Sequence, residues 1–209
     1  MALYMRAVII CNGAIADYGY IRAQINSSDI IICADGGYDH AVRMGIVPSA
    51  VVGDFDSISC MPDDNVACLR YPTRKDLTDT EIAINYARDK GFRDFLFLAA
   101  TGSRLDHSLT NIFLLKSMLE HGEKAVLVDE HNKVMITDST LCLCEPIGSI
   151  VSLIPLSDCR GVTTENLEYP MNNAEMFMGK GLGVSNIMVE CNAAVSVSEG
   201  TLLVIVAKD

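Results

Sequence analysis

Short apolar runs and longer mixed stretches alternate along the chain as far as Asp129. Six runs rich in Val, Ile, Leu or Phe each have the length of one strand, and they cover residues 6–11, 29–33, 50–53, 66–69, 95–100 and 124–128. The intervening stretches with helical spacing or helix end signals are residues 17–26, 38–44, 78–90 and 103–120. Strands that alternate with helices predict a doubly wound, mostly parallel, Rossmann-like α/β sheet.

The pattern changes after Asp129. The later apolar runs are short and are separated by Gly, Asn and Pro, and they cover residues 134–137, 140–144, 149–154, 161–164, 187–190, 194–197 and 202–207. None of this part has the spacing of an amphipathic helix, so we expect a β-sandwich or a barrel. The sequence therefore predicts an α/β domain over residues 1–129 and an all-β sandwich domain over residues 130–209.

Helix end signals indicate where two of the helices begin. Thr78 and Glu81 have the spacing of a capping box, so one helix should start there. Ser103 is the expected N-cap of the next helix, with Asp106 in its first turn. The helix dipole stabilises a carboxylate in the first turn, which is a sufficient structural reason for Asp79 and does not by itself indicate a site.

The composition narrows the choice of partners. Half of the 209 residues are hydrophobic, and the net charge at pH 7 is −11. So acidic a chain is a poor match for nucleic-acid phosphates or an anionic membrane, and we expect neither as a partner. The charge is compatible with a cationic substrate or with acids gathered around a divalent metal. A solvated surface explains most of the acids.

The eight cysteines form no Cys-x-x-Cys pair. Cys11 and Cys33 end apolar runs, and Cys142 and Cys144 share one face of an expected strand, so we interpret them as small buried hydrophobic residues in a reducing compartment. The four histidines are scattered, which argues against zinc. The apolar run at residues 7–11 is too short for a signal peptide, and no stretch could span a membrane, so we expect a cytoplasmic protein.

Asp54 and Asp56 follow the third apolar run, which ends at Gly53. A strand that delivers acids beyond its carboxyl end is the layout of a ligand site in an open α/β sheet. Residues i and i+2 of extended backbone point the same way, so both carboxylates can face one ion. Such oxygen ligands suit Mg²⁺. The alternative is an Asp-rich turn whose side chains cap backbone amides.

A second turn, after the run at residues 29–33, contains Asp35, Gly36 and Gly37. Asp35 is a further acid at the carboxyl end of a strand. The two glycines allow the backbone to approach a ligand closely or to make a tight turn.

A third turn contains Thr101, Gly102 and Ser103 before a helix, where backbone amides form a natural phosphate cradle. Arg104 can neutralise phosphate charge beside it. His107 could act as an acid or base, although a first-turn histidine is more often bonded to a neighbour.

Acids gather at the expected strand ends and helix starts, namely Asp35, Asp54, Asp56, Asp76, Asp79 and Asp106. In one cleft these carboxylates would repel and raise one another's pKa values. A converging cleft therefore needs cations, and the candidates are Mg²⁺, Arg74, Lys75, Arg104 and a cationic substrate.

An ordered set of motifs covers nearly the whole chain. They are residues 34–37 (Ala-Asp-Gly-Gly), 53–58 (Gly-Asp-Phe-Asp-Ser-Ile), 75–80 (Lys-Asp-Leu-Thr-Asp-Thr), 102–107 (Gly-Ser-Arg-Leu-Asp-His), 161–164, 167–170 and 183–186. In order and spacing they resemble the thiamine pyrophosphokinase (thiamine diphosphokinase) family. Each motif is weak alone, whereas the ordered set is specific.

The resemblance implies an N-terminal α/β catalytic domain, a C-terminal β-sandwich and a homodimer with its active sites between subunits. It also implies transfer of a pyrophosphoryl group from the co-substrate ATP to the hydroxyl of thiamine, which gives thiamine diphosphate and AMP. Phosphoryl chemistry of this kind depends on positioning and charge neutralisation more than on covalent help.

Residue by residue, the resemblance also implies roles. Mg²⁺ would be bound by Asp54, Asp56 and Asp79, which with Asp106 make up the catalytic set. The ATP and thiamine site would be lined by Asp35, Thr78 and Asp106. The thiamine rings would be held by Tyr169, Ser185 and Asn186, which would reach the partner subunit's catalytic domain. Asp54 or Asp106 could take the hydroxyl proton, and the sequence does not choose between them.

Two departures from the family pattern concern thiamine. The chain has no Trp, and Tyr169 stands where some members place a stacking Trp. Asn166 stands where many members have Gly, and Asn tolerates the positive φ of such a turn. Two rival functions stay open at this point: another Mg²⁺-dependent nucleotide transferase that uses Asp54 and Asp56, and a non-catalytic sensor of thiamine or nucleotide.

Overall fold

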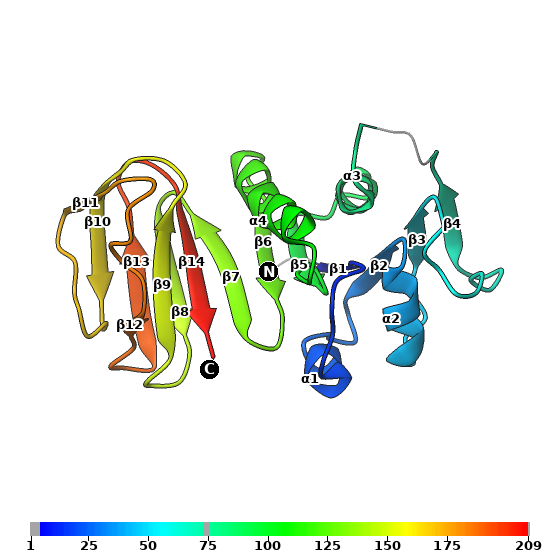
Figure 1. Cartoon of the computed structure of the whole chain (residues 1–209), viewed down its shortest axis with the longest axis horizontal. Coiled ribbons are helices and arrows are strands. Elements are labelled where there is room, and N and C mark those ends of the chain that lie inside the picture. Colours follow the sequence, from blue (N-terminus) through cyan, green and yellow to red (C-terminus); the bar gives the residue numbers. More distant parts are fainter. Residues whose placement is uncertain (1–4, 73–75, 209) are drawn as a thin grey trace. The chain divides into compact units, whose positions relative to one another are not determined.

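The computed structural model describes residues 5–72 and 76–208. It divides into two compact units, residues 1–130 and 131–209. Figure 1 shows that the first unit contains helices and strands and that the second is built from strands alone. Among the described residues, no helix combines the length and the apolar character needed to cross a membrane.

The first unit is built on parallel strands. They are β1 (Ala7–Ile10), β2 (Ile30–Ala34), β3 (Ala50–Gly53), β4 (Ala67–Arg70), β5 (Asp94–Leu98) and β6 (Lys124–Val128). Within the unit their order is β4-β3-β2-β1-β5-β6, and every neighbouring pair is parallel. The prediction of a mixed α/β unit with a mainly parallel sheet is confirmed.

Four helices connect these strands: α1 (Tyr18–Ala23), α2 (Gly37–Arg43), α3 (Asp79–Asp89) and α4 (Leu105–Glu120). In Figure 1, α1 and α2 lie on one side of the parallel strands, and α3 and α4 lie on the other. α1 ends at Ala23, three residues before the predicted end at Asn26. Asn26 and the two serines that follow it favour turns over helix interiors.

Both faces of the central strands are buried, which explains their unbroken apolar character. Alternate residues of β1 point to opposite faces, and Val8 and Ile10 belong to a buried cluster that also includes Ile21 of α1 and Tyr38 of α2. The direction in which successive strands are added to the sheet reverses at β1. β2, β3 and β4 are added on one side of β1, and β5 and β6 are added on the other side. In open α/β sheets, ligands bind beyond the carboxyl ends of the strands at such a reversal.

The second unit has two antiparallel groups of strands. Its strands are β7 (Asn132–Thr137), β8 (Thr140–Cys144), β9 (Ile150–Pro155), β10 (Cys159–Glu165), β11 (Ala174–Met176), β12 (Asn186–Ile187), β13 (Asn192–Ser196) and β14 (Leu202–Ala207). Their orders are β12-β9-β14-β7 and β11-β10-β13-β8. The expected antiparallel β domain is confirmed. β11 was not predicted, because it is three residues long and follows two asparagines.

The cysteines are only partly as predicted. Cys11, Cys33 and Cys159 are buried free thiols. Cys142 and Cys144 are exposed, so their interpretation as buried residues is wrong. They do share one face of β8, but β8 is the outer strand of its group, and that face of it meets solvent.

Candidate active site

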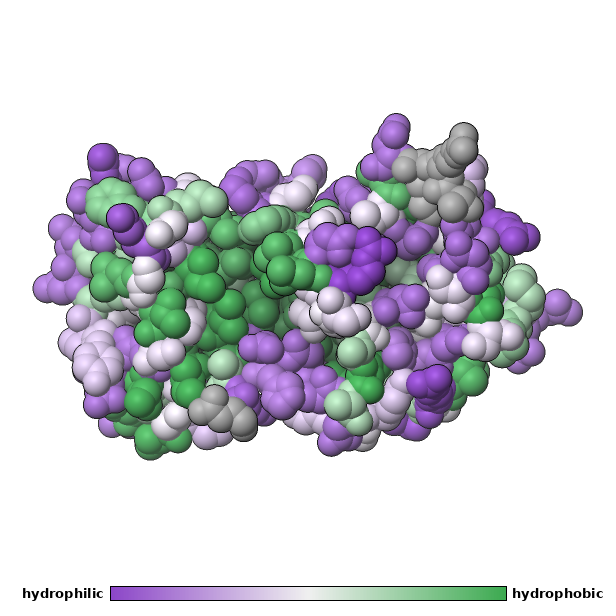
Figure 2. Space-filling view, viewed as in Figure 1, coloured by the Kyte–Doolittle hydropathy of each residue, from purple (hydrophilic) through white to green (hydrophobic). Residues whose placement is uncertain are grey.

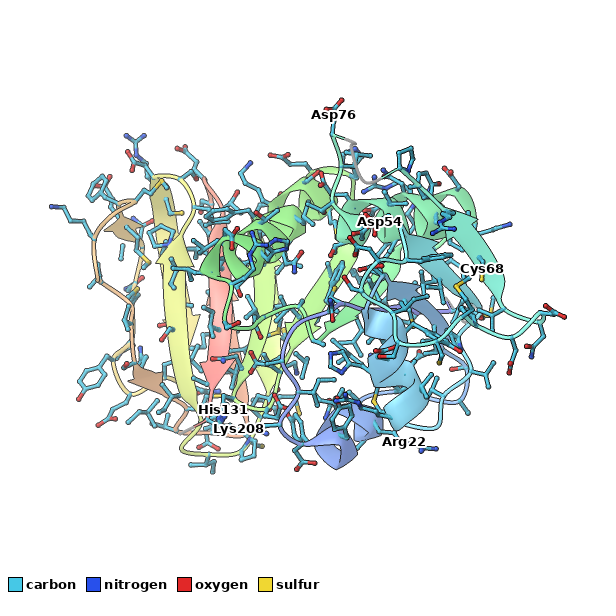
Figure 3. All side chains as sticks on the ribbon, turned by 45° about the vertical axis from the view of Figure 1, so that its right-hand side comes forward. Arg22, Asp54, Cys68, Asp76, His131 and Lys208 are labelled. Atoms are coloured by element: carbon cyan, nitrogen blue, oxygen red, sulfur yellow. The ribbon has the colours of Figure 1, made fainter. Side chains whose placement is uncertain are left out.

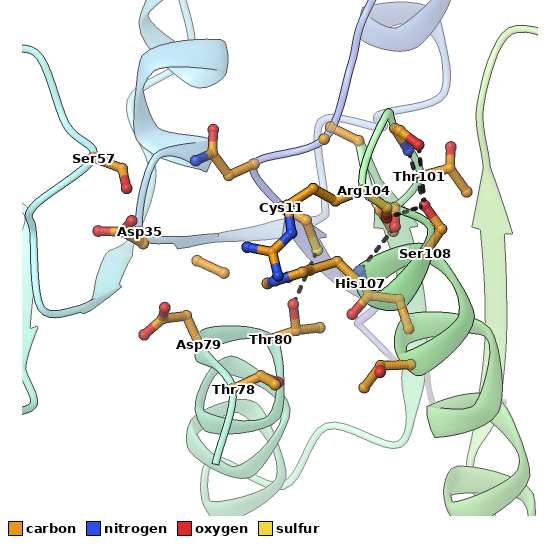
Figure 4. A pocket seen from close by; sticks show the side chains of 18 of the residues that line it. Cys11, Asp35, Ser57, Thr78, Asp79, Thr80, Thr101, Arg104, His107 and Ser108 are labelled. Carbon is orange, nitrogen blue, oxygen red and sulfur yellow. Dashed lines mark hydrogen bonds between the residues drawn. The ribbon is translucent and has the colours of Figure 1, made fainter. Parts of the chain in front are cut away.

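A cavity of about 1010 Å³ lies in the first unit. Its lining begins at the carboxyl ends of β1, β2, β3 and β5 and continues onto the first turns of α3 and α4. Figure 4 shows Asp35 and Asp79 on one side of this pocket and Arg104 reaching across it from the start of α4. The pocket therefore occupies the place that the sheet reversal predicts for a ligand.

Three acids converge in this pocket. One carboxylate oxygen from each of Asp35, Asp54 and Asp56 lies within 4.8 Å of the others. Asp35 is buried, Asp54 is half-buried and Asp56 is exposed, so the cluster runs from the protein interior to the pocket mouth. Converging hard oxygen donors, partly open to water and substrate, fit the ligand preference of Mg²⁺.

Neighbouring strands bring these acids together. β2 and β3 pair in parallel, with Ala34 opposite Val52, so the residues that follow them leave the sheet side by side. The Asp35 carboxylate accepts the N–H of Phe55 at 3.1 Å, which fastens the two turns to each other. Gly53 is required here, because its φ is +151° and a Cβ on it would lie 2.9 Å from the Cβ of Asp35.

The alternative interpretation, an Asp-rich turn whose side chains bond to nearby groups of the same turn, also describes part of what the structure shows. Asp54 Oδ1 accepts the N–H of Asp56 at 3.2 Å, and Asp56 Oδ1 accepts the hydroxyl of Ser57 at 2.8 Å. These bonds shape the turn. They account for the contacts within the turn and do not involve Asp35, which comes from a different strand.

Two loops at the reversal are hydrogen-bonded to each other, and we call residues 12–16 and 99–103 the paired loops. Gly13 donates its N–H to Ala99 O at 2.7 Å, and Ala14 donates to Thr101 O at 2.9 Å. A Cβ on Gly13 would lie 2.1 Å from Thr101 O, so only glycine allows this approach. The predicted phosphate cradle, Thr101 to Arg104, lies at this place and lines the pocket.

The prediction that Ser103 caps α4 is wrong. The N-cap is Arg104, which has extended backbone and makes no side-chain cap. Instead, Ser108 Oγ accepts the N–H of Gly102 at 3.1 Å and donates to Arg104 O at 3.0 Å. These two bonds hold the loop at Gly102 against the first turn of α4. Asp106 is in the first turn of α4 as predicted.

The predicted capping box at the start of α3 is confirmed. Glu81 N–H donates to Thr78 Oγ1 at 3.2 Å, and Thr78 N–H donates to the Glu81 carboxylate at 2.8 Å. This fixes Thr78, Asp79 and Thr80 in the pocket wall. Behind them, burial raises the pKa of the Cys11 thiol to about 11, so this pocket thiol stays protonated and is not a nucleophile.

Arg104 and Asp106 form an ion pair at the pocket entrance. The guanidinium Nε and Nη2 lie 3.2 Å and 2.5 Å from the two carboxylate oxygens of Asp106. This hydrogen-bonded pair lowers the pKa of Asp106 to about 2. A carboxylate with so low a pKa is a weak proton acceptor, which argues against Asp106 as the base. His107 also lines the pocket.

Most of the predicted site residues of the first unit line this one pocket, namely Asp35, Asp54, Asp56, Thr78, Asp79, Thr101, Gly102, Arg104 and Asp106. Arg74 and Lys75 lie outside the described residues. Asp76 is exposed and, among the described residues, is not part of the lining; Figure 3 shows it pointing away from the fold.

Gly36 and Gly37 precede and begin α2 and are not part of the described pocket lining. A Cβ on Gly37 would lie 2.0 Å from Ile10 O, and one on Gly36 would meet the Asn12 amide at 2.4 Å. Close packing of α2 against the end of β1 therefore accounts for both glycines. The structure gives them no direct contact role in the pocket.

The predicted thiamine residues lie together in the second unit. Asn186 is buried, and its side chain accepts the N–H of Tyr169 at 3.0 Å and donates to Tyr169 O at 2.7 Å. The Tyr169 ring is exposed, and Ser185 is exposed with a positive φ of +59°. Asn166 has φ +60°, so it does adopt the backbone expected of a glycine.

Sequence reasoning missed several lining residues, namely Cys11, Asn12, Gly13, Ala14, Ser57, Ser108, Thr110 and Asn111. Asn12 and Gly13 follow the first strand and could have been found by the same strand-end argument that found Asp35. Ser108 and Asn111 carried no such signal, since polar residues of a helix usually face water.

Both parts of the chain match thiamin pyrophosphokinase family models. Residues 21–127 match the catalytic domain, and residues 140–202 match the vitamin B1 binding domain. Thiamine pyrophosphokinase of Bacillus subtilis (strain 168) is 30% identical over 186 residues, which cover 85% of this chain and 87% of that protein.

Solved structures agree in fold over almost the whole chain. The thiamin pyrophosphokinase of Geobacillus thermodenitrificans is 26% identical with a TM-score of 0.86, and 98% of each chain is covered. The Bacillus subtilis enzyme is 24% identical with a TM-score of 0.87, covering 98% of this chain and 99% of the other. At this identity the second likeness shows the fold alone.

Proposed function

The chain belongs to the thiamin pyrophosphokinase family, and on that premise we propose that the pocket of its first unit binds ATP and Mg²⁺ for the family's reaction. The protein is an enzyme that transfers a pyrophosphoryl group from ATP to thiamine and gives thiamine diphosphate. This membership disfavours the sensor and the unrelated nucleotide transferase that the acids alone left open.

The chemistry sets what the pocket must do. The hydroxyl oxygen of thiamine forms a bond to the β-phosphorus of ATP, the bond from that phosphorus to the α–β bridging oxygen breaks, AMP leaves, and the hydroxyl proton is released. In-line positioning and charge neutralisation contribute most to such a transfer. A nucleophilic side chain is not needed, which agrees with the protonated state of Cys11.

The observation that carries this proposal is the meeting of Asp35, Asp54 and Asp56 within 4.8 Å. We assign Mg²⁺ to Asp54 and Asp56 with Asp35 beside them, and Asp79, from the first turn of α3, as a further ligand. Bound there, Mg²⁺ would neutralise phosphate charge and stabilise the leaving AMP. The acidic pocket also suits the positive charge of the thiazolium ring.

The phosphates belong, in this proposal, at the paired loops and Arg104. Thr101 and Gly102 precede α4, whose first backbone amides favour an anion. Arg104 reaches into the pocket and supplies a fixed positive charge (Figure 4). Because Asp106 is held in its ion pair with Arg104, we propose Asp54 as the acceptor of the hydroxyl proton.

The second unit would select the acceptor. We propose that the exposed Tyr169 ring stacks on thiamine and that Ser185 bonds to it, which agrees with the match of residues 140–202 to a vitamin B1 binding domain. Asn186 would act by holding the backbone of Tyr169. In this assignment residues 1–129 form the catalytic domain, a doubly wound Rossmann-like sheet, and residues 130–209 form a thiamine-binding β-sandwich.

A homodimer is part of the proposal. Leu105, Leu109 and Phe113 repeat every fourth residue on α4, and 68%, 42% and 51% of their surface is exposed. Such a stripe favours a protein contact. Figure 2 shows further apolar side chains gathered over the second unit, which includes the exposed Phe177 and Leu182. A second copy of the chain is the proposed partner.

We also propose the cytoplasm as the location. All eight cysteines are free thiols, and five of them are exposed. Exposed thiols of this kind persist in a reducing compartment.

Single substitutions test the metal assignment. We expect Asp54→Asn and Asp56→Asn to lower the rate of AMP formation by about 100-fold or more, because charge-stabilising contacts commonly contribute that much. The matched control is Asp29→Asn, which weakens the Arg6–Asp29 ion pair at the opposite end of β2 and should retain near-normal activity. Near-normal activity of Asp54→Asn at low Mg²⁺ would overturn the assignment.

A further inference from the structure

Two adjacent residues of α2, Asp39 and His40, each hold a different wall of the pocket, although neither is part of its described lining. We propose that α2 is the positioning element of the site, in which Asp39 fixes the acid-bearing turn and His40 fixes the paired loops. The inference rests on the proposed function, because it assumes that the acids bind the cation and the paired loops bind the nucleotide.

Asp39 holds the end of the turn that carries two of the acids. Its carboxylate accepts the N–H of Ser59 at 3.0 and 3.2 Å and also accepts the Ser59 hydroxyl. Both donors of one residue are therefore bound by one side chain. These bonds, led by the one from the Ser59 hydroxyl, lower the pKa of Asp39, so it is ionised at neutral pH. The turn from Asp54 to Ser59 is thus fixed at one end by β3 and at the other by α2.

His40 holds the paired loops. Its Nε2 lies 2.8 Å from Gly13 O, and its Nδ1 lies 2.8 Å from the Tyr18 hydroxyl. A carbonyl can only accept, so Nε2 carries the proton and Nδ1 accepts from Tyr18. The Tyr18 oxygen in turn accepts from Arg43 Nη1 at 3.0 Å. The chain of bonds leads from α2 to Gly13, at the point where the paired loops approach most closely.

The position of α2 is itself fixed. Gly37 leaves no room for a Cβ against Ile10 O, so the helix starts in direct contact with the end of β1. Asp35, one of the three acids, is two residues earlier in the chain. The separation between the acids and the paired loops is therefore set by one short helix and two adjacent side chains. Partners that orient binding groups in this way typically change affinity by about 10- to 100-fold when removed.

The test measures cation and nucleotide binding separately in the full-length protein. Mn²⁺ binding without nucleotide is followed by electron paramagnetic resonance, and ATP binding in EDTA is followed by calorimetry. We expect Asp39→Ala to weaken Mn²⁺ binding by about 10-fold or more and to change ATP binding by less than about 3-fold. We expect His40→Leu to show the opposite pattern.

Two controls separate positioning from general stability. Asp29→Ala removes a buried aspartate side chain that accepts the backbone N–H of Asn26 at 2.8 Å and pairs with Arg6. Asp29 lies at the far end of β2, so this variant lowers stability away from the pocket and should change neither affinity. His40→Gln can place an amide N–H where Nε2 lies and should restore ATP binding to within about 3-fold of wild type. If Asp39→Ala does not fold, Ser59→Ala removes the hydroxyl bond alone and should give a smaller shift in the same direction.

The outcomes are distinguishable. Wild-type Mn²⁺ binding that disappears in Asp54→Asn but is unchanged in Asp39→Ala or Ser59→Ala would overturn the inference and leave the proposed metal site standing. Equal losses of Mn²⁺ and ATP binding in Asp39→Ala and His40→Leu would also overturn it. Wild-type protein that binds no Mn²⁺, or binds it equally well with Asp54→Asn, would overturn the metal site and the inference together.

Discussion

Asp35, Phe55 and Ala99 are non-glycine residues with positive φ, and each follows a different strand that ends at the pocket. Backbone in this region costs of order 1–3 kcal/mol per residue and persists only where the surroundings impose it. Here the surroundings do so, because all three residues are buried and the side chain of Asp35 is bonded to Phe55. The other described non-glycine residues with positive φ are Asn166, Asn173 and Ser185 of the second unit, and Ser185 is one of the predicted thiamine residues. In the first unit, the strained positions all lie at strand ends beside the pocket, which supports its assignment as the functional site.

At the same scale, the Arg104–Asp106 pair gives a direct titration prediction. Removing the guanidinium in Arg104→Gln should raise the pKa of Asp106 from about 2 toward its usual 3.8, because the bond to Arg104 is the main cause of the shift. Carboxyl carbon NMR of the two proteins measures this value. An Asp106 pKa that stays near 2 in the variant would contradict the pairing, and with it the argument against Asp106 as the base.

At the scale of elements, the start of α3 can be tested by stability. Thr78→Ala removes the side-chain acceptor of the capping box and should lower the free energy of unfolding by about 1 kcal/mol. Glu81→Gln is the matched control, since glutamine also completes a capping box and should have a smaller effect. Urea denaturation of both variants decides the matter. Equal stability of Thr78→Ala and wild type would show that the box does not hold this wall of the pocket.

The strands were predictable because apolar runs record burial on both faces of a parallel sheet. The capping box of α3 was predictable because both partners are close in sequence. The cap of α4 was not predictable: Ser103 has the right chemistry, but Ser108, five residues later, forms the bond that shapes the loop. β11 and the exposure of Cys142 depend on which strand lies next to which, and a local pattern does not contain that information.

The candidate site also contains residues that the sequence predicted and residues that it did not. Asp35, Asp54 and Asp56 were found because strand ends mark the ligand edge, but their meeting point required the pairing of β2 with β3. The roles of Asp39 and His40 could not be predicted, because each acts through a residue 20 or more positions away. Helical polar residues with distant partners resemble surface residues in the sequence.

For the whole molecule, the proposed division of labour predicts complementation. All described residues that line the pocket lie between Cys11 and Asn111, in the first unit. Tyr169 and Ser185 belong to the second unit. If each site of a two-fold dimer uses the first unit of one subunit and the second unit of its partner, inactive Asp54→Asn should complement inactive Tyr169→Ala/Ser185→Ala. One hybrid site then carries both defects and the other carries neither, so a mixed dimer should regain up to about half of wild-type activity.

The complementation result is read with two controls. Subunit exchange is followed with differently tagged chains, and Phe113→Lys, in the α4 stripe, should reduce both dimer formation and recovery. Exchange without any recovered activity would mean that each site is built within one chain.

The most direct test of the central claim is the stoichiometry of products from the purified protein with ATP, thiamine and Mg²⁺. Transfer of a pyrophosphoryl group predicts AMP and thiamine diphosphate in equal amounts and no AMP without thiamine. With Asp54→Asn, the formation of both products should slow by about 100-fold or more. Formation of ADP with thiamine monophosphate, or AMP release that is independent of thiamine, would contradict the account.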